Sequence, residues 1–131
     1  MTQNQEQLLR IFERRILRGI FGPVKEKNVW RRRYNFEIDR LYGEPDIVKT
    51  IKINRLRWLG HVARMKGERV PKKLLNGFPE GKRSAGRPKA RWLDAVNSDI
   101  KILNIRDWKT LAEDRSGWRI ELEKAKTAPG L

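Results

Sequence analysis

Apolar side chains recur every three or four positions along most of this chain. In residues 5–21 they form a stripe that includes Leu9 and Ile20, which is the spacing of an amphipathic helix. The same periodicity predicts helices over residues 30–42 and 46–65. Glycine and proline separate these segments. We therefore expect three helices in the first half of the chain.

Two further helices are expected after a polar, glycine-rich stretch. The first spans residues 88–103, and the second spans residues 107–126, with Asp107 as its N-cap. The inner side of the second helix is expected to carry Trp108, Leu111, Ala112, Arg115, Trp118 and Leu122. No alternating pattern indicates a sheet. The expected fold class is all-α, with a three-helix N-terminal part, a basic loop and a C-terminal helical hairpin.

Composition divides the chain into three expected regions. Residues 1–66 form a basic helical region, residues 67–87 form a basic flexible linker, and residues 88–127 form the C-terminal helical hairpin. Within the linker, residues 70–75 are expected to form one short turn.

Positive charge dominates the composition. The chain has 31 Lys and Arg against 16 Asp and Glu, for a net charge of +15. This excess makes nucleic acid, either RNA or DNA, the expected partner, with an anionic membrane surface as the competitor. The surplus lies before Asp94, because residues 94–131 hold seven basic and seven acidic side chains. The last helices are therefore expected to be a packing module.

Other features of the sequence indicate the cellular location and the kinds of partner to expect. No apolar run is long enough to span a bilayer, the N-terminus lacks the features of a signal peptide, and the chain has no cysteine. We expect an intracellular protein, nuclear or cytoplasmic, with no membrane partner and no small-molecule substrate. Lys72-Lys73 and Lys82-Arg83 are a weak nuclear-entry signal.

Basic side chains in three parts of the chain are candidate phosphate contacts. Arginine recurs every four residues on the first predicted helix, although such a row can also be a solvated face. The candidate nucleic-acid-binding residues are Arg10, Arg14, Arg18, Arg31, Arg32, Arg33, Arg55, Arg57, Lys82, Arg83, Arg87, Lys89 and Arg91.

The segment from Gly81 to Asp94 joins a cation-rich loop to an apparent helix that carries Trp92. Its core, Gly86-Arg87-Pro88, partly matches the minor-groove hooks that enter A·T tracts. General phosphate contact is the other interpretation. In both interpretations, the segment is a junction. Cations that face a polyanion lie before it, and the helical hairpin that packs lies after it.

The five tryptophans have two possible uses, base stacking and core packing. We assign Trp108 and Trp118 to the core, favour the core for Trp92 and Trp58, and leave Trp30 open because three arginines follow it.

Gly60 interrupts the third predicted helix. Glycine inside a helix costs about 1 kcal/mol relative to alanine. Its presence indicates the close approach of another helix, a backbone contact or simple tolerance.

The sequence offers no catalytic, metal or cofactor site. Polymerase chemistry needs clustered carboxylates that hold metal ions, and the acidic residues here are scattered. A zinc site built on His61, the one histidine, would need carboxylate ligands. No serine has a base partner in a recognisable spacing. We expect no enzyme activity and no cofactor.

Several motifs, in order, point to a family. They are Phe12-Glu13-Arg14-Arg15, Trp30-Arg31-Arg32-Arg33-Tyr34-Asn35, Arg55-Leu56-Arg57-Trp58-Leu59-Gly60-His61-Val62-Ala63-Arg64-Met65, Gly81-Lys82-Arg83, Gly86-Arg87-Pro88, Arg91-Trp92-Leu93-Asp94, Asp114-Arg115 and Trp118-Arg119. The chain resembles the region after the polymerase core in the reverse transcriptases of non-LTR, LINE-like retrotransposons. This resemblance covers nearly the whole chain.

The resemblance implies a C-terminal tail that holds template RNA or target DNA, with the reverse transcriptase core as a further candidate partner. The chain departs from the family because it lacks the Tyr/Ala-x-Asp-Asp polymerase signature and the endonuclease domain. It begins where the parent's core would end, so we expect a tail fragment. The expected function is non-catalytic nucleic-acid binding. The alternative is a structural remnant, a helical packing element without independent activity.

Overall fold

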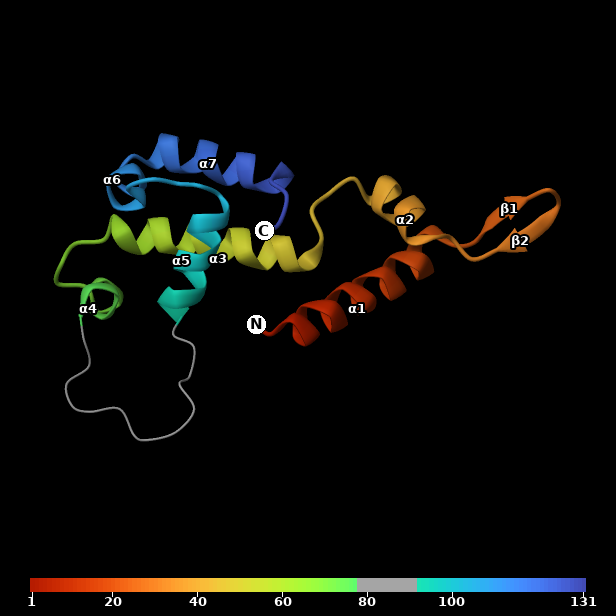
Figure 1. Cartoon of the computed structure of the whole chain (residues 1–131), viewed down its shortest axis with the longest axis horizontal. Helices are drawn as coiled ribbons and strands as arrows, with labels where there is room; N and C mark the ends of the chain where they lie inside the picture. The colour runs from red at the N-terminus through yellow and green to blue at the C-terminus, as the bar shows by residue number, and fades with distance from the viewer. Residues whose placement is uncertain (78–91) are drawn as a thin grey trace, which may run out of the picture. The chain divides into compact units, whose positions relative to one another are not determined.

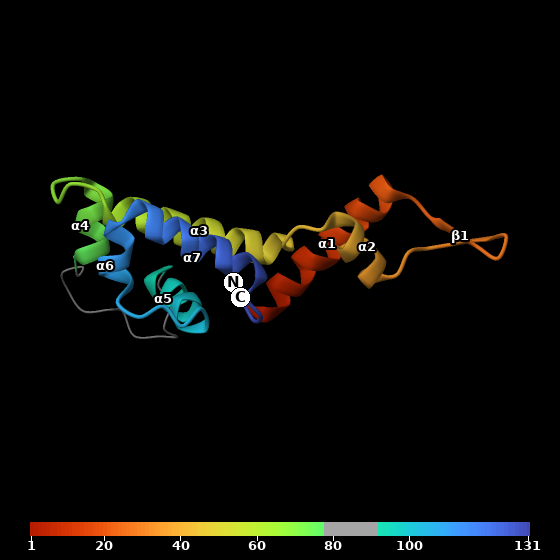
Figure 2. The same cartoon turned by 90° about the horizontal axis from the view of Figure 1, so that it is seen from above.

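The computed structural model describes residues 1–77 and 92–131. Within these ranges the chain is mostly helical, with seven helices and one two-stranded sheet (Figures 1 and 2). The prediction of a helical fold is confirmed in this general form. The described residues form two compact units, residues 1–51 and residues 52–131. The three-part division expected from composition stays a prediction.

The N-terminal unit begins with α1 (Gln3–Phe21). Thr2 caps this helix, because its hydroxyl accepts a hydrogen bond from the Gln5 backbone while the Gln5 side chain accepts one from the Thr2 backbone. Gly22 ends the helix with a φ of 65°, a value that glycine adopts at little cost. The helix predicted over residues 5–21 is confirmed.

A β-hairpin follows α1, and this element contradicts the sequence-based prediction. Strands β1 (Val24–Glu26) and β2 (Val29–Arg31) pair antiparallel. Lys27 and Asn28 form the turn with φ values of 47° and 64°. Two central residues with positive φ suit the right-handed twist of a tight hairpin. Two expectations from the sequence were therefore wrong, the absence of a sheet and a helix that starts near residue 30.

Two helices follow the hairpin: α2 completes the N-terminal unit, and α3 runs from this unit into the second one. Helix α2 (Asn35–Tyr42) starts later than predicted, and α3 (Ile47–Ala63) matches its predicted range closely. Asp46 caps α3 through a 2.7 Å hydrogen bond from the Lys49 backbone N–H to Oδ1. Residues 47–51 of α3 belong to the first unit and residues 52–63 to the second.

The described residues of the second unit form four further helices. They are α4 (Val70–Asn76), α5 (Trp92–Ile102), α6 (Trp108–Glu113) and α7 (Arg115–Thr127). The prediction of a single helix over residues 107–126 is wrong, because the helix is interrupted at Asp114. The carboxylate of Asp114 accepts hydrogen bonds from the backbone N–H groups of Ser116 and Gly117, each 2.9 Å long, and so caps α7.

Asp107 does not cap α6 as predicted. Its backbone is left-handed, with a φ of 42°, and its side chain accepts no hydrogen bond from a helix N–H. The carboxylate instead accepts a hydrogen bond from the Thr110 hydroxyl at 2.7 Å. The start predicted near residue 107 is confirmed, but its cap is not.

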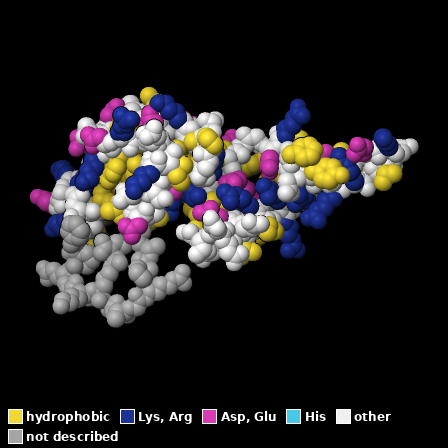
Figure 3. Space-filling view, in the orientation of Figure 1, with side chains coloured by type: hydrophobic (Ala, Val, Ile, Leu, Met, Phe, Trp, Pro, Cys, Tyr) yellow, Lys and Arg dark blue, Asp and Glu magenta, His cyan; other side chains and the backbone are white. Residues whose placement is uncertain are grey.

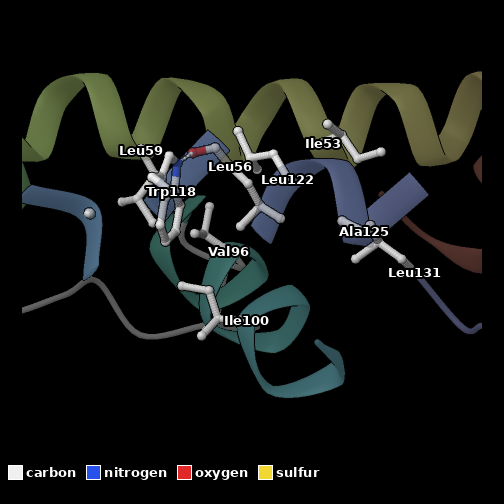
Figure 4. Close-up of a cluster of buried hydrophobic side chains, with 10 residues drawn as sticks. Ile53, Leu56, Leu59, Val96, Ile100, Trp118, Leu122, Ala125 and Leu131 are labelled. Atoms are coloured by element: carbon white, nitrogen blue, oxygen red, sulfur yellow. Dashed lines mark hydrogen bonds between the residues drawn. The ribbon is translucent and has the colours of Figure 1, made fainter. Parts of the chain in front are cut away.

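The core of the second unit forms where α7 lies along α3 and α5 crosses it (Figures 1 and 2). Figure 4 shows the apolar side chains that these helices contribute, with Trp118 of α7 against Leu56 and Leu59 of α3. Trp118 is 2% exposed, and its Nε1–H donates a 3.1 Å hydrogen bond to the Leu56 carbonyl oxygen. A buried indole N–H needs such a partner, so this bond fixes the ring against α3.

Gly60 makes this contact possible. A Cβ atom at that position would lie 2.3 Å from Nε1 of Trp118, well inside van der Waals contact. Of the three interpretations of Gly60, close approach of another helix is confirmed.

A buried ion pair joins α3 to α5. A guanidinium N–H of Arg55 donates to Oδ2 of Asp99, and both side chains are largely removed from solvent. A buried carboxylate without a cation would carry a large desolvation penalty. In the structure, Arg55 therefore has a structural task.

Candidate nucleic-acid interface

Acidic neighbours neutralise several of the arginines in the N-terminal unit. Nε of Arg10 lies 2.7 Å from Oδ2 of Asp46, and Nε of Arg14 lies 3.6 Å from Oδ1 of Asp39. Burial acts to raise the pKa of Asp46, but the hydrogen bonds from Arg10 and from the Lys49 backbone outweigh it and lower that pKa. Arg10 and Arg14 thus have local charge partners.

Arg31 pairs with two carboxylates, those of Glu26 and Glu37. Its guanidinium donates two 2.9 Å hydrogen bonds to Glu37 and one 2.5 Å bond to Glu26. The Glu37 carboxylate also accepts a bond from the Tyr34 backbone. The hydrogen bonds from Arg31 are the main reason that the pKa of Glu37 falls to about 2. Arg31 ties the hairpin to α2.

The other three predicted site residues of this unit lack an ion pair with any described acidic residue. Arg18 donates to the Arg33 carbonyl and to the Asn35 side chain, and Arg33 donates to the Gly22 carbonyl at 3.0 Å. Carbonyl oxygens orient a guanidinium but leave its charge uncompensated. Arg32 is exposed. We call Arg18, Arg32 and Arg33 the N-terminal arginine surface.

The N-terminal arginine surface lines two adjoining hollows. Trp30 borders one of them and is 65% exposed, while Tyr34 borders the other. Lys and Arg side chains gather around the place where α1, α2 and the hairpin meet (Figure 3). Exposed cations next to exposed aromatic rings are a combination that suits nucleic acid.

The second unit carries a larger hollow, about 550 Å³, between α3 and α7. We call it the α3–α7 groove. Its lining includes the buried Trp118 and Leu122 and the exposed Trp58 and His61. Around these lie four guanidinium groups. They belong to Arg57, Arg64, Arg115 and Arg119.

None of these four arginines forms an ion pair with a described carboxylate. Arg57 donates to the Asn54 side-chain oxygen and Arg64 to the Ala112 carbonyl, each at 2.6 Å. Arg115 and Arg119 are exposed, and their guanidinium groups have no hydrogen-bond partner among residues 1–77 and 92–131. The first pair is held in place by neutral oxygens, and the second pair is free to meet an anion.

The acidic residue of the groove is already engaged. Glu123 pairs with Lys126, whose Nζ lies 2.7 Å from Oε2. The hydrogen bond from Lys126 is the main cause of a lowered pKa at Glu123, and the charges of Arg119 and Arg57 lower it further against the opposing effect of desolvation. The four arginines and this one carboxylate therefore leave the lining of the groove with a net positive charge.

An aromatic surface lies beside these charges. Trp58 is 50% exposed, and its ring centroid lies 5.3 Å from that of His61 at an interplanar angle of 40°. Leu56 and Leu59, two residues before and one residue after Trp58 on α3, are fully buried. Trp58 is thus held on a rigid helix while its ring faces solvent.

The structure places the predicted site residues in different settings. Arg57 lies in the α3–α7 groove and Arg55 in the buried ion pair. The five loop cations lie outside the described residues. They are Lys82, Arg83, Arg87, Lys89 and Arg91.

Sequence reasoning missed Arg64, Arg115 and Arg119. Arg115 was expected on the inner side of its helix, but it is exposed. Helical spacing could have shown that Arg115 and Arg119 share one face of α7. The packing of α7 on α3, which the sequence does not reveal, brings that face to Arg57 and Arg64.

The tryptophans divide differently from the prediction. Trp118 is core and Trp108 packs against the core, as expected. Trp58 and Trp92, which is 43% exposed, are not buried, so their assignment to the core was wrong.

Within the described residues, no three His, Asp or Glu side chains lie close enough together to hold a metal ion. No helix in that part of the chain is long and apolar enough to cross a membrane.

Comparison with known proteins shows that the chain is similar to a transposon-derived protein. No protein-family model and no solved structure matches the chain. The chain is 32% identical over 121 residues to an uncharacterized transposon-derived protein of Caenorhabditis elegans. The match covers 88% of this chain and 42% of that protein, so the chain spans less than half of its relative. The similarity indicates a transposon-related origin.

Proposed function

We propose that this chain is a non-catalytic nucleic-acid-binding segment of a retrotransposon-derived protein and holds RNA or DNA through phosphate contacts. One observation carries the proposal: guanidinium groups without an ion-pair partner in the described part of the chain gather on shared surfaces. In the α3–α7 groove these are Arg57, Arg64, Arg115 and Arg119. Arginine forks suit phosphate oxygens.

The origin of the chain supports the same proposal. Its motifs resemble the post-polymerase region of non-LTR reverse transcriptases, and its relative is transposon-derived. In a reverse transcriptase that copies RNA onto nicked DNA, a basic tail would hold the template RNA or the target DNA. The finer assignment to a LINE-like tail is part of this proposal.

Binding should be tested by fluorescence anisotropy with labelled RNA and DNA oligonucleotides. Affinity should fall steeply between about 50 mM and about 200 mM salt, because each phosphate contact releases a counterion. A flat salt response or no binding would contradict the proposal. A nuclease assay with magnesium on the same preparation should detect no cleavage.

A second candidate is a helical packing element of a longer protein, such as the tail's contact with the polymerase core. It is favoured by α1, which contributes no buried residue in the described part of the chain. Its exposed apolar side chains are Leu8, Ile11, Phe12, Ile16 and Ile20. A non-cooperative thermal melt by circular dichroism would favour this candidate, and a cooperative melt with salt-dependent RNA binding would favour the first.

A further inference from the structure

We propose that the α3–α7 groove binds single-stranded nucleic acid, with one base stacked on Trp58 and adjoining phosphates held by Arg115 and Arg119. This inference rests on the proposed function, because it names the form of nucleic acid that the groove accepts. It assigns the stacking role to one residue and the phosphate role to two others, so the parts can be tested separately.

Trp58 is exposed enough to stack on a base. Half of this side chain is open to solvent although Leu56 and Leu59, on the same helix, are completely buried. An exposed indole on a rigid helix is a flat apolar platform, and every nucleic-acid base has a π-face that can stack on it. The ring of His61 lies beside it, with its centroid 5.3 Å away and its plane tilted by 40°.

Positively charged side chains near Trp58 can hold the phosphates of the same strand. Arg115 and Arg119 lie one turn apart on α7 and line the same groove as Trp58. Neither has an ion-pair partner among the described residues, and Glu123 is held by Lys126. A ligand that fits must present an aromatic face and anionic groups together, as a nucleotide does.

The form of the nucleic acid follows from the position of its bases. In a duplex the base faces are stacked on one another, so they cannot cover Trp58 without unstacking. In a single strand they are accessible. An acidic peptide could satisfy the arginines, but it would leave the indole uncovered. The groove therefore suits a single strand better than either alternative.

The ligand comparison tests the stacking role directly in the unmodified protein. We would measure anisotropy with a single-stranded thymidine oligonucleotide of about 12 nucleotides and with an abasic strand of equal length. The two strands carry the same phosphates. The thymidine strand should bind roughly 5- to 150-fold more tightly, the range expected for one stacked base.

Variants at Trp58 and Trp92 then show which side chain stacks on the base. Trp58→Ala should bind both strands with the weaker, abasic affinity, and Trp58→Phe should keep most of the preference. Trp92→Ala is the matched control, because Trp92 is similarly exposed but lies outside the groove. It should retain the full preference.

Each outcome separates the inference from the proposed function. If the unmodified protein binds both strands equally, or Trp58→Ala keeps the preference, the stacking proposal is overturned while phosphate binding stands. If the matching duplex, or an oligoglutamate of equal charge, competes as well as the thymidine strand, the groove is not a single-strand site. If no oligonucleotide binds, the proposed function itself fails.

Discussion

Gly60 and Trp118 compete for the same space where α3 meets α7. A Cβ atom at position 60 would lie 2.3 Å from Nε1 of Trp118 and 2.4 Å from its Cδ1. The indole cannot easily move away, because it is 2% exposed and donates a hydrogen bond to Leu56. Gly60→Ala should therefore destabilise the second unit by about 1–3 kcal/mol, as overpacking does. Urea unfolding followed by near-UV circular dichroism would measure it.

Gly19→Ala is the matched control for this substitution. Gly19 also lies inside a helix, but a Cβ atom there would meet nothing within 4 Å in the described part of the chain. The change should be neutral or stabilising by up to about 1 kcal/mol, because alanine is the better helix former. Equal unfolding midpoints for Gly60→Ala and the unmodified protein would show that the packing differs from that described.

The Arg55–Asp99 pair should be important for stability rather than binding. Asp99→Ala leaves a buried guanidinium without its carboxylate and should cost about 3–5 kcal/mol. The double change Arg55→Met with Asp99→Leu should cost less than that, because neither charge remains buried. Urea midpoints of the variants would show this order.

Nucleic-acid affinity of a folded Arg55→Met, Asp99→Leu protein decides between the two roles of Arg55. If Arg55 is structural, that affinity should equal the affinity of the unmodified chain. A loss of affinity without a loss of stability would restore Arg55 as a phosphate contact.

The carboxylate of Glu37 should titrate far below the ordinary range. Its pKa is lowered from 4.5 to about 2 by hydrogen bonds from Arg31 and from the Tyr34 backbone. A carboxyl group with a depressed folded-state pKa stabilises the fold above its unfolded pKa, and that contribution is lost as the pH falls from about 4.5 to about 2. The Glu37 side-chain carbon should show this midpoint in an NMR titration.

Two arginine variants test the cause of that shift. Arg31→Met should raise the midpoint of Glu37 toward its ordinary value, because the positive charge and the two hydrogen bonds to Glu37 are lost. Arg32→Met removes an adjacent exposed arginine that makes no hydrogen bond to Glu37 and should leave the midpoint unchanged. A similar midpoint in both variants would argue against the ion pair.

The cap of α7 should contribute measurably to stability. Asp114→Ala removes the acceptor for two backbone N–H groups, those of Ser116 and Gly117, and should cost about 0.5–2 kcal/mol. Asp107→Ala removes only an acceptor for the Thr110 hydroxyl and should cost less. Thermal melts of the two variants would compare them, and a larger loss from Asp107→Ala would contradict this assignment of the caps.

Sequence periodicity predicted most of the helices but not the hairpin. The strands are three residues long, too short to display alternation, and the turn residues Lys27 and Asn28 have positive φ without a glycine. The alternatives at Gly60 could be stated but not decided, because the decisive atom belongs to Trp118, far along the chain.

The candidate site was predictable only in part, because charge was counted by segment rather than by face. The last helices are neutral in total, yet Arg115 and Arg119 lie on one side of α7. Arg57 lies on α3 and Arg64 directly follows its last residue, Ala63, and both line the groove. Only the packing of these helices creates the groove.

The dependence of single-strand affinity on salt tests the account most directly. Arg115→Gln with Arg119→Gln should reduce the slope of log affinity against log salt by about 1.4, which corresponds to two lost contacts with a single strand. Arg106→Gln with Lys109→Gln removes the same charge from exposed positions outside the groove and should leave the slope unchanged. Equal slopes in the two double variants, or no salt-dependent binding by the unmodified chain, would contradict the account.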